Sequence, residues 1–248
     1  MHLRFTVAIT LFTSILVLCT GVASASFSVK DAASALDRAE EPAQFSEQAV
    51  RLETYMHTLQ KPQPDALAQL ARAYYLQGEA EKNKIKKFAY LDKSVDAADR
   101  ALKAAPGDNI ALYWRSMSLL QKADISSGFT ALGFVKEALK GLETVGDKAP
   151  AYDFAGAFRS RGKVLIEAPG WSFIGDKKKG LELLQKAKKL APNLLVNRLY
   201  LAQAYKANGM LGEAVTELEY IIAAPARTKD DLKTKEEARR LLNTTPLR

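Results

Sequence analysis

Apolar residues recur at spacings of three and four along nearly the whole chain, which is the period of an α-helix with one buried face. The alternating pattern typical of β-strands is nearly absent. The helical pattern is interrupted at short intervals, and short connections between helices favour antiparallel hairpins. We therefore expect an all-α protein. The predicted helices lie near residues 30–40, 43–60, 65–77, 86–104, 109–123, 130–146, 151–168, 177–191, 195–208, 211–224 and 230–243.

Prolines mark the boundaries of a repeat. Pro64, Pro106, Pro150, Pro192 and Pro225 each lie between two predicted helices. The intervals between them are about 40 residues long, apart from a last one of about 33, and each interval holds two helices. A single helix pair cannot bury both of its faces, so successive pairs stack around one continuous core. The spacing predicts a helical-hairpin solenoid.

The last interval, residues 193–225, resembles a tetratricopeptide (TPR) repeat. Small side chains at two facing positions allow the helix axes to approach closely, a tyrosine fills the space between them, and a glycine permits the turn. The early tryptophan of the family is replaced by Arg198. The matching residues are Leu201, Ala202, Tyr205, Gly209, Ala214, Leu218, Ile221 and Pro225.

The other intervals carry the same pattern in stretched form, and the interval 106–150 matches least well. The loop "PGWSFIG" at 169–175 lengthens one of them. The resemblance covers residues 65–225 and implies a solenoid of degenerate TPR-like repeats. The expected organisation is a signal peptide at 1–25, an N-terminal helical hairpin at 26–63, four TPR-like helix pairs at 64–225 and a C-terminal capping helix at 226–248.

The first residues have the features of a cleavable secretory signal. Arg4 precedes an apolar stretch at 5–18, and "VASA" at 22–25 places small residues where a signal peptidase cuts. Cleavage after Ala25 predicts a periplasmic or secreted protein. It removes Cys19, the only cysteine, and with it disulfides and thiolate metal sites. The alternative is a lipoprotein anchored at Cys19, although Leu18 departs from the small residue that such signals place before the cysteine.

The mature chain lacks the side chains that most enzymes need. Its one histidine is His57, and it contains no metal-ligand spacing, no Gly-x-Ser-x-Gly elbow and no phosphate-binding loop. We expect no catalysis, no metal and no cofactor. The formal net charge is +8. In an exported protein this excess of cations favours acidic partners or an anionic membrane surface over nucleic acid.

The TPR resemblance implies that the first helix of each pair lines a concave groove. Arginine offers a planar, two-pronged donor and tyrosine an amphipathic ring, which suit carboxylates and extended peptides. The alternative is that these side chains form an ordinary solvated surface. The expected groove residues are Arg72, Tyr75, Arg159, Lys163, Leu199, Gln203 and Lys206.

Two pairs of aromatic residues are candidates either for core packing or for binding a partner. Tyr113 and Trp114 lie in a predicted helix, where core packing is favoured. Trp171 and Phe173 lie in the inserted loop, where packing is also favoured, by a smaller margin over a docking site. Three lysines at 177–179 follow at a helix start. Positive charge there opposes the helix dipole, so these lysines suit an acidic partner or an anionic membrane better than they suit helix stability.

Residues 151–209 are also similar to bacterial periplasmic repeat proteins grouped with the T component of tripartite ATP-independent periplasmic (TRAP) transporters. This narrower resemblance implies a partner, the solute receptor of the transporter. The residues that carry it are Arg159, Gly162, Pro169-Gly170, Lys177 to Lys179, Pro192-Asn193 and Asn197 to Ala202.

Together these features predict an exported, non-enzymatic, TPR-like module that binds another protein through a concave groove. The alternative is a T-component-like accessory protein that binds a solute receptor or a small organic anion. A further alternative is an envelope scaffold that forms homo-oligomers through Trp171 and Phe173.

Overall fold

The computed structural model describes residues 27–169 and 172–244. The described residues form helices without any strand, which confirms the predicted all-α class. Each predicted helix is present, and its ends lie within a few residues of the expected positions. The helices are α1 (Val29–Arg38), α2 (Pro42–His57), α3 (Pro64–Ala80), α4 (Lys84–Ala104), α5 (Asn109–Asp124), α6 (Gly128–Lys148), α7 (Tyr152–Glu167), α8 (Lys177–Leu190), α9 (Leu195–Ala207), α10 (Leu211–Ala223) and α11 (Lys229–Asn243).

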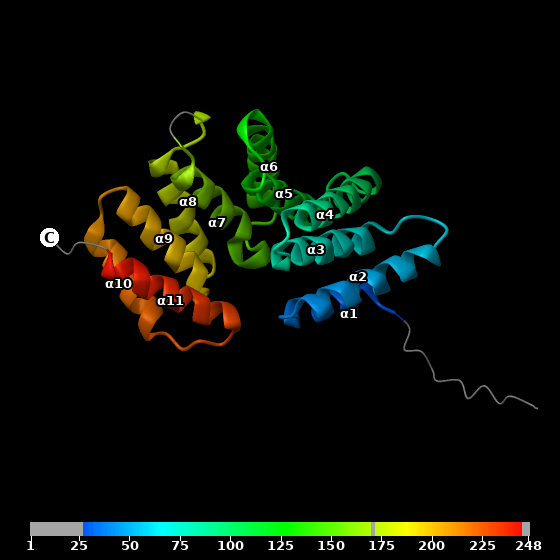
Figure 1. Cartoon of the computed structure of the whole chain (residues 1–248), viewed down its shortest axis with the longest axis horizontal. Coiled ribbons are helices and arrows are strands. Elements are labelled where there is room, and N and C mark those ends of the chain that lie inside the picture. Colours follow the sequence, from blue (N-terminus) through cyan, green and yellow to red (C-terminus); the bar gives the residue numbers. More distant parts are fainter. Residues whose placement is uncertain (1–26, 170–171, 245–248) are drawn as a thin grey trace, which may run out of the picture.

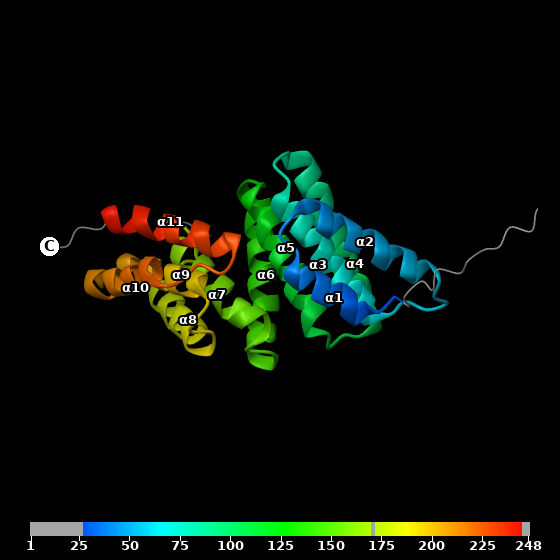
Figure 2. The ribbon, with the colours of Figure 1, turned by 90° about the horizontal axis from the view of Figure 1, so that it is seen from below.

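The helices pack in chain order as a solenoid. Each helix contacts the next, and α3 with α4, α5 with α6, α7 with α8 and α9 with α10 form hairpin pairs. The first helices also touch across the pairs, as in α1 with α3, α3 with α5, α7 with α9 and α9 with α11. Figures 1 and 2 show α1 to α5 on one side of α6 and α7 to α11 on the other.

Local sequence explains where the helices begin and turn. Pro42 and Pro64 occupy the first turns of α2 and α3, where the missing N–H costs nothing. Gly209 adopts φ +76°, which confirms the permissive turn that the TPR pattern predicts there. Side-chain oxygens accept hydrogen bonds from the free N–H groups of five helix starts. These capping residues are Ser28, Asn83, Asp108, Asp176 and Thr228.

Small residues set how closely the helices approach. A Cβ added at Gly162 of α7 would lie 2.6 Å from Leu184 Cγ and 3.0 Å from the carbonyl oxygen of Gly180 in α8. The crossing therefore requires glycine at this position. Ala202 and Ala214 are fully buried, as the repeat pattern predicts for residues between paired helices.

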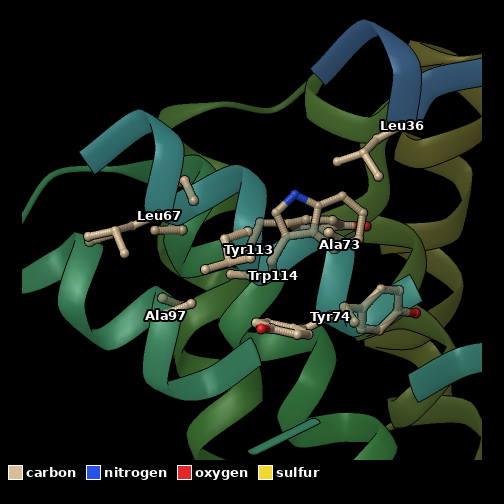
Figure 3. Packing of buried hydrophobic residues seen from close by; sticks show 14 of the residues in the cluster. Leu36, Leu67, Ala73, Tyr74, Ala97, Tyr113 and Trp114 are labelled. Atoms are coloured by element: carbon tan, nitrogen blue, oxygen red, sulfur yellow. The ribbon is translucent and has the colours of Figure 1, made fainter. Parts of the chain in front are cut away.

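An aromatic cluster lies where the two halves of the solenoid meet. The ring centres of Tyr113 and Trp114 are 5.0 Å apart, and those of Tyr113 and Tyr152 are 5.1 Å apart. Tyr75 of α3 lies 5.1 Å from Trp114. The indole of Trp114 is 5% exposed and Tyr113 is fully buried, which confirms the packing interpretation of this pair. Figure 3 shows both rings in the core, with Leu36 of α1 in the same cluster.

Candidate binding surface

The candidate site is the inner surface formed by the first helices of the pairs. At its N-terminal end the structure places Arg72 and Tyr75 in the wall. Arg72 Nη2 lies 2.7 Å from Asp37 Oδ1 of α1, and its guanidinium lies 5.3 Å from the ring centre of Trp114. Tyr75 is 5% exposed beside the same ring. Both side chains are thus engaged within the chain, so they offer a partner little free surface.

Arg159 is likewise engaged within the chain. Its Nη2 lies 2.7 Å from Asp153 Oδ2, and its Nη1 donates to the carbonyl oxygens of Asp153 and Phe154 and to Asn197 Oδ1. The Arg159 side chain is 13% exposed. The guanidinium of Arg159 therefore holds the start of α7 in place. The sequence analysis expected this guanidinium to face a ligand in the groove.

The backbone that Arg159 holds is strained. Asp153, Phe154 and Ala155 adopt φ values of 47°, 53° and 64°. Each non-glycine residue in this left-handed region costs roughly 1–2 kcal/mol. Tyr113 donates to Asp153 Oδ2 at 2.5 Å, and the buried Asn197 donates to Phe154 O at 3.2 Å, so neighbouring helices impose the turn. The sequence analysis missed the roles of Arg159 and Asn197 in holding this turn. The available signal for Asn197 was a polar residue at the start of a predicted helix among Leu195, Leu199 and Leu201.

Lys163 is the next of the predicted groove cations. Its Nζ lies 4.6 Å from the ring centre of Tyr200, 3.5 Å from the Tyr200 hydroxyl and 4.0 Å from Glu167 Oε2. Burial lowers the pKa of Lys163, but the neighbouring Tyr200 and Glu167 outweigh it and leave the pKa raised. Lys163 is therefore protonated at neutral pH and lies beside an aromatic ring.

Three carboxylates share this surface with Lys163. Burial is the largest cause that raises the pKa values of Glu79 on α3, Asp124 on α5 and Glu167 on α7. Asp230 raises the pKa of Glu79 further, and Asp124 does the same for Glu167. Lys163 only partly offsets the burial of Asp124 and Glu167. All three side chains remain exposed to solvent, so this surface holds negative charge that is only partly withdrawn from water.

The raised pKa of Glu79 predicts a pH-dependent stability difference. A carboxyl with a folded pKa above its unfolded value favours the folded state at low pH, and this contribution is lost as the pH rises through the folded pKa. Glu79→Gln should therefore raise the melting temperature at pH 7. The gain stays below about 1 kcal/mol because Glu79 is exposed to solvent. It should vanish below a pH of about 4.

Thermal unfolding followed by circular dichroism across this pH range checks the prediction. Glu219→Gln, on the exposed face of α10, is the matched control and should follow the unmodified chain. A Glu79→Gln variant less stable than the unmodified chain at pH 7 would contradict the poor solvation of this carboxylate.

The C-terminal end of the inner surface is covered by α11. Leu199 packs in a cluster with Ala238 of α11, Lys206 Nζ donates to Thr244 O at 3.2 Å, and Gln203 is half-buried. Lys229 at the start of α11 forms ion pairs with Glu40 and Glu41 in the turn between α1 and α2. Figures 1 and 2 both show the start of α11 beside the end of α1. The solenoid therefore curves until its two ends meet.

Phe173 in the inserted loop does not pack against the helices, although packing is the favoured prediction for it. Phe173 is 98% exposed and adopts φ 54°, so it does not fill the space beside the longer turn. The packing interpretation is wrong for this residue. Trp171 lies outside the described residues, as does the predicted signal peptide.

Within the ranges 27–169 and 172–244, no three histidine, cysteine or acidic residues are placed to bind a metal ion. No helix in these ranges has the length and apolarity to span a membrane.

Comparison with solved structures confirms the repeat fold. TTC0263, a thermophilic TPR protein of Thermus thermophilus, superposes with a TM-score of 0.63 at 16% identity, over 86% of this chain and 100% of that one. The MamA RS-1 ArsTM double mutant aligns with a TM-score of 0.48 at 20% identity, over 87% and 97%, which is too distant to support an argument. The chain is thus a TPR-like repeat protein in its fold.

Sequence comparison adds one partial match. The family model of regulator of microtubule dynamics protein 1-3 matches residues 177–246, which hold α8 to α11. No curated protein matches the chain. The match covers less than half of the chain, so it adds to the likeness with helical repeat proteins without assigning a function.

Proposed function

We propose that this chain is an exported, non-enzymatic scaffold that binds an extended, basic segment of a partner protein on its concave surface. The observation that carries this proposal is the set of carboxylates of Glu79, Asp124 and Glu167 on three successive first helices. Like charges that lie close together cost stability in the free chain, as the effect of Asp124 on the pKa of Glu167 illustrates. The same charge becomes favourable when lysine or arginine side chains of a ligand approach it.

The remaining inner residues suit a peptide rather than a small solute. Lys163 and Tyr200 present a cation beside an amphipathic ring, which accommodates backbone carbonyl groups and apolar side chains. TPR-like folds generally bind other proteins, and their first helices supply the surface. Export rests on the predicted signal at 1–25 and remains part of the proposal.

The alternative of a transporter accessory that binds an organic anion is less well supported. Arg72 and Arg159, the arginines that would hold a carboxylate, already form ion pairs with Asp37 and Asp153. The names of the thermophilic TPR protein and of the matching family model mention no transporter. We therefore favour a basic protein segment over an anionic solute.

Selection from a random peptide display library tests the proposal. The purified chain is the bait, and the selected peptides are then titrated against variants by fluorescence anisotropy. We expect the selected peptides to be rich in lysine and arginine. The double variant Glu79→Gln with Asp124→Asn should weaken their binding at least roughly tenfold, because each lost charged hydrogen bond is worth about 1.5–3 kcal/mol.

The matched control removes the same amount of charge from an outer helix. Glu213→Gln with Glu219→Gln changes two exposed residues of α10 and should leave the affinity unchanged. The proposal fails if no peptide is enriched. It also fails if the inner and outer double variants bind the selected peptides equally well.

A further inference from the structure

The turns within the helix pairs lie side by side along one edge of the solenoid. Lys122, near the end of α5, lies 4.7 Å from the ring centre of Phe88 in α4 and 4.5 Å from that of Phe134 in α6. Asn208, in the turn after α9, donates to Lys177 O at the start of α8. Successive pairs therefore present their turns on the same side.

Three of these turns expose a large apolar side chain. Ile85 at the start of α4 is 82% exposed, Phe129 at the start of α6 is 92% exposed, and Phe173 before α8 is 98% exposed. Phe173 also has a left-handed backbone, which costs free energy without gaining any packing. An isolated exposed apolar residue is common, but one on each of three neighbouring turns makes an apolar row. We call Ile85, Phe129 and Phe173 the edge row.

Unpaired lysines flank the edge row. Lys82, Lys84 and Lys86 surround Ile85, and Lys177 and Lys178 follow Phe173; all five lie near the row and form no ion pair with the described residues. Acids also lie near these turns, among them Glu79, Asp124 and Glu167 at the ends of the preceding helices. Asp176 accepts from the N–H of Lys179, and Glu81 accepts from the N–H of Asn83.

The position of these lysines is not explained by helix stability. Lys84 and Lys86 lie in the first turn of α4, and Lys177 and Lys178 lie in the first turn of α8. The helix dipole places partial positive charge at a helix start, so cations there are unfavourable. The lysines therefore leave positive charge at the surface available for an anionic partner.

We propose that this edge docks on the surface of an anionic lipid bilayer. Apolar side chains that alternate with lysines match the interface, where the apolar tips enter the acyl boundary and the ammonium groups meet lipid phosphates. A protein partner fits less well, because the cores of protein interfaces are depleted in lysine. A second copy fits less well still, because two such edges would bring like charges together.

Docking through this edge uses other side chains than ligand binding by Glu79, Asp124 and Glu167. These carboxylates lie at the ends of α3, α5 and α7, which lead into the turns of the edge row. The two proposals therefore concern adjoining surfaces with different residues. Variants of one set test one proposal and leave the residues of the other unchanged.

Vesicle flotation tests the docking. The full chain is mixed with vesicles of phosphatidylcholine alone or of phosphatidylcholine with phosphatidylglycerol, and the bound fraction is measured at low and high salt. We expect binding only to the anionic vesicles, with loss at high salt. Phe129→Ser with Phe173→Ser, and separately the change of Lys84, Lys86, Lys177 and Lys178 to glutamine, should each lower the partition coefficient at least roughly tenfold.

The matched control is Val50→Ser with Phe154→Ser, which removes exposed apolar side chains of α2 and of the first turn of α7, at the other end of α7 from Phe173. This variant should bind as the unmodified chain does, and circular dichroism should show all variants folded. The proposal is overturned if anionic vesicles do not bind the chain. It is also overturned if the edge variants bind as well as the control, which would assign the binding to another segment such as residues 1–26.

Discussion

Replacing Arg159 with alanine should lower the free energy of unfolding by about 1.5–3 kcal/mol, because it removes a charged hydrogen bond from the partly buried carboxylate of Asp153. The guanidinium pairs with Asp153 and also binds the carbonyl oxygens of Asp153 and Phe154. Those carbonyls belong to the left-handed turn at residues 153–155, whose conformation has a cost of its own. Removing Arg159 therefore frees both an acid and a strained backbone. Urea unfolding followed by circular dichroism measures the effect.

Two further variants separate this role from simple loss of charge. Arg159→Lys should recover only a small part of the stability, because lysine keeps the charge but cannot bind several acceptors with a planar fork. Arg51→Ala is the control, since Arg51 is half exposed and lies 3.9 Å from Glu47 one helical turn away. It should cost less than about 1 kcal/mol. A similar loss in Arg51→Ala and Arg159→Ala would show that Arg159 does not hold the turn.

Replacing Trp114 with alanine should cost about 3–5 kcal/mol, the range for removing a large aromatic from a core. The indole packs against Tyr75 of α3, Tyr113 of α5 and the guanidinium of Arg72. It also donates from Nε1 to the Tyr152 hydroxyl of α7 at 2.8 Å. The residue thus connects three first helices, so its loss should weaken contact between the two halves of the solenoid as well as local packing.

Urea unfolding of three variants tests this account. Trp114→Phe keeps most of the ring and loses the hydrogen bond, so it should cost less than the alanine variant. Phe173→Ala removes an aromatic that is 98% exposed and should change stability by no more than about 0.5 kcal/mol. If Trp114→Ala is as mild as Phe173→Ala, the aromatic cluster is not the junction of the fold.

The helices and their order were predictable because they depend on local patterns. Apolar spacing located each helix, and prolines located the pairs. Gly209 and the alanines at 202 and 214 followed from the TPR pattern and occupy the expected places. These features depend on the residue itself and its near neighbours in the sequence, which is why a single chain reveals them.

The groove residues were only partly predictable, because their roles depend on helices distant in the sequence. Periodicity places Arg72 on the inner surface, but it does not reveal that Asp37 of α1 lies beside it. The same holds for Arg159, whose partners include Asn197 on α9. The left-handed turn at 153–155 has no glycine to signal it and depends on contacts made by three helices.

The carboxylates of the inner surface were missed for a related reason. Glu79, Asp124 and Glu167 each lie at or near the C-terminal end of a first helix. From the sequence alone, an acid at such a position is assigned to an ordinary solvated surface. Only the stacking of the helices brings Asp124 close to Glu167 and Glu79 close to Asp230 of α11. Their shared surface was therefore a property of the fold.

Hydrogen–deuterium exchange with a selected basic peptide tests the concave-surface proposal most directly. Exchange is measured by mass spectrometry on the free and peptide-bound chain. We predict slower exchange in α3, α5 and α7, whose ends carry Glu79, Asp124 and Glu167, and little change in the outer helices α4, α6 and α8. Protection confined to the outer helices, or a bound peptide that leaves α3, α5 and α7 unprotected, would contradict binding on the concave surface.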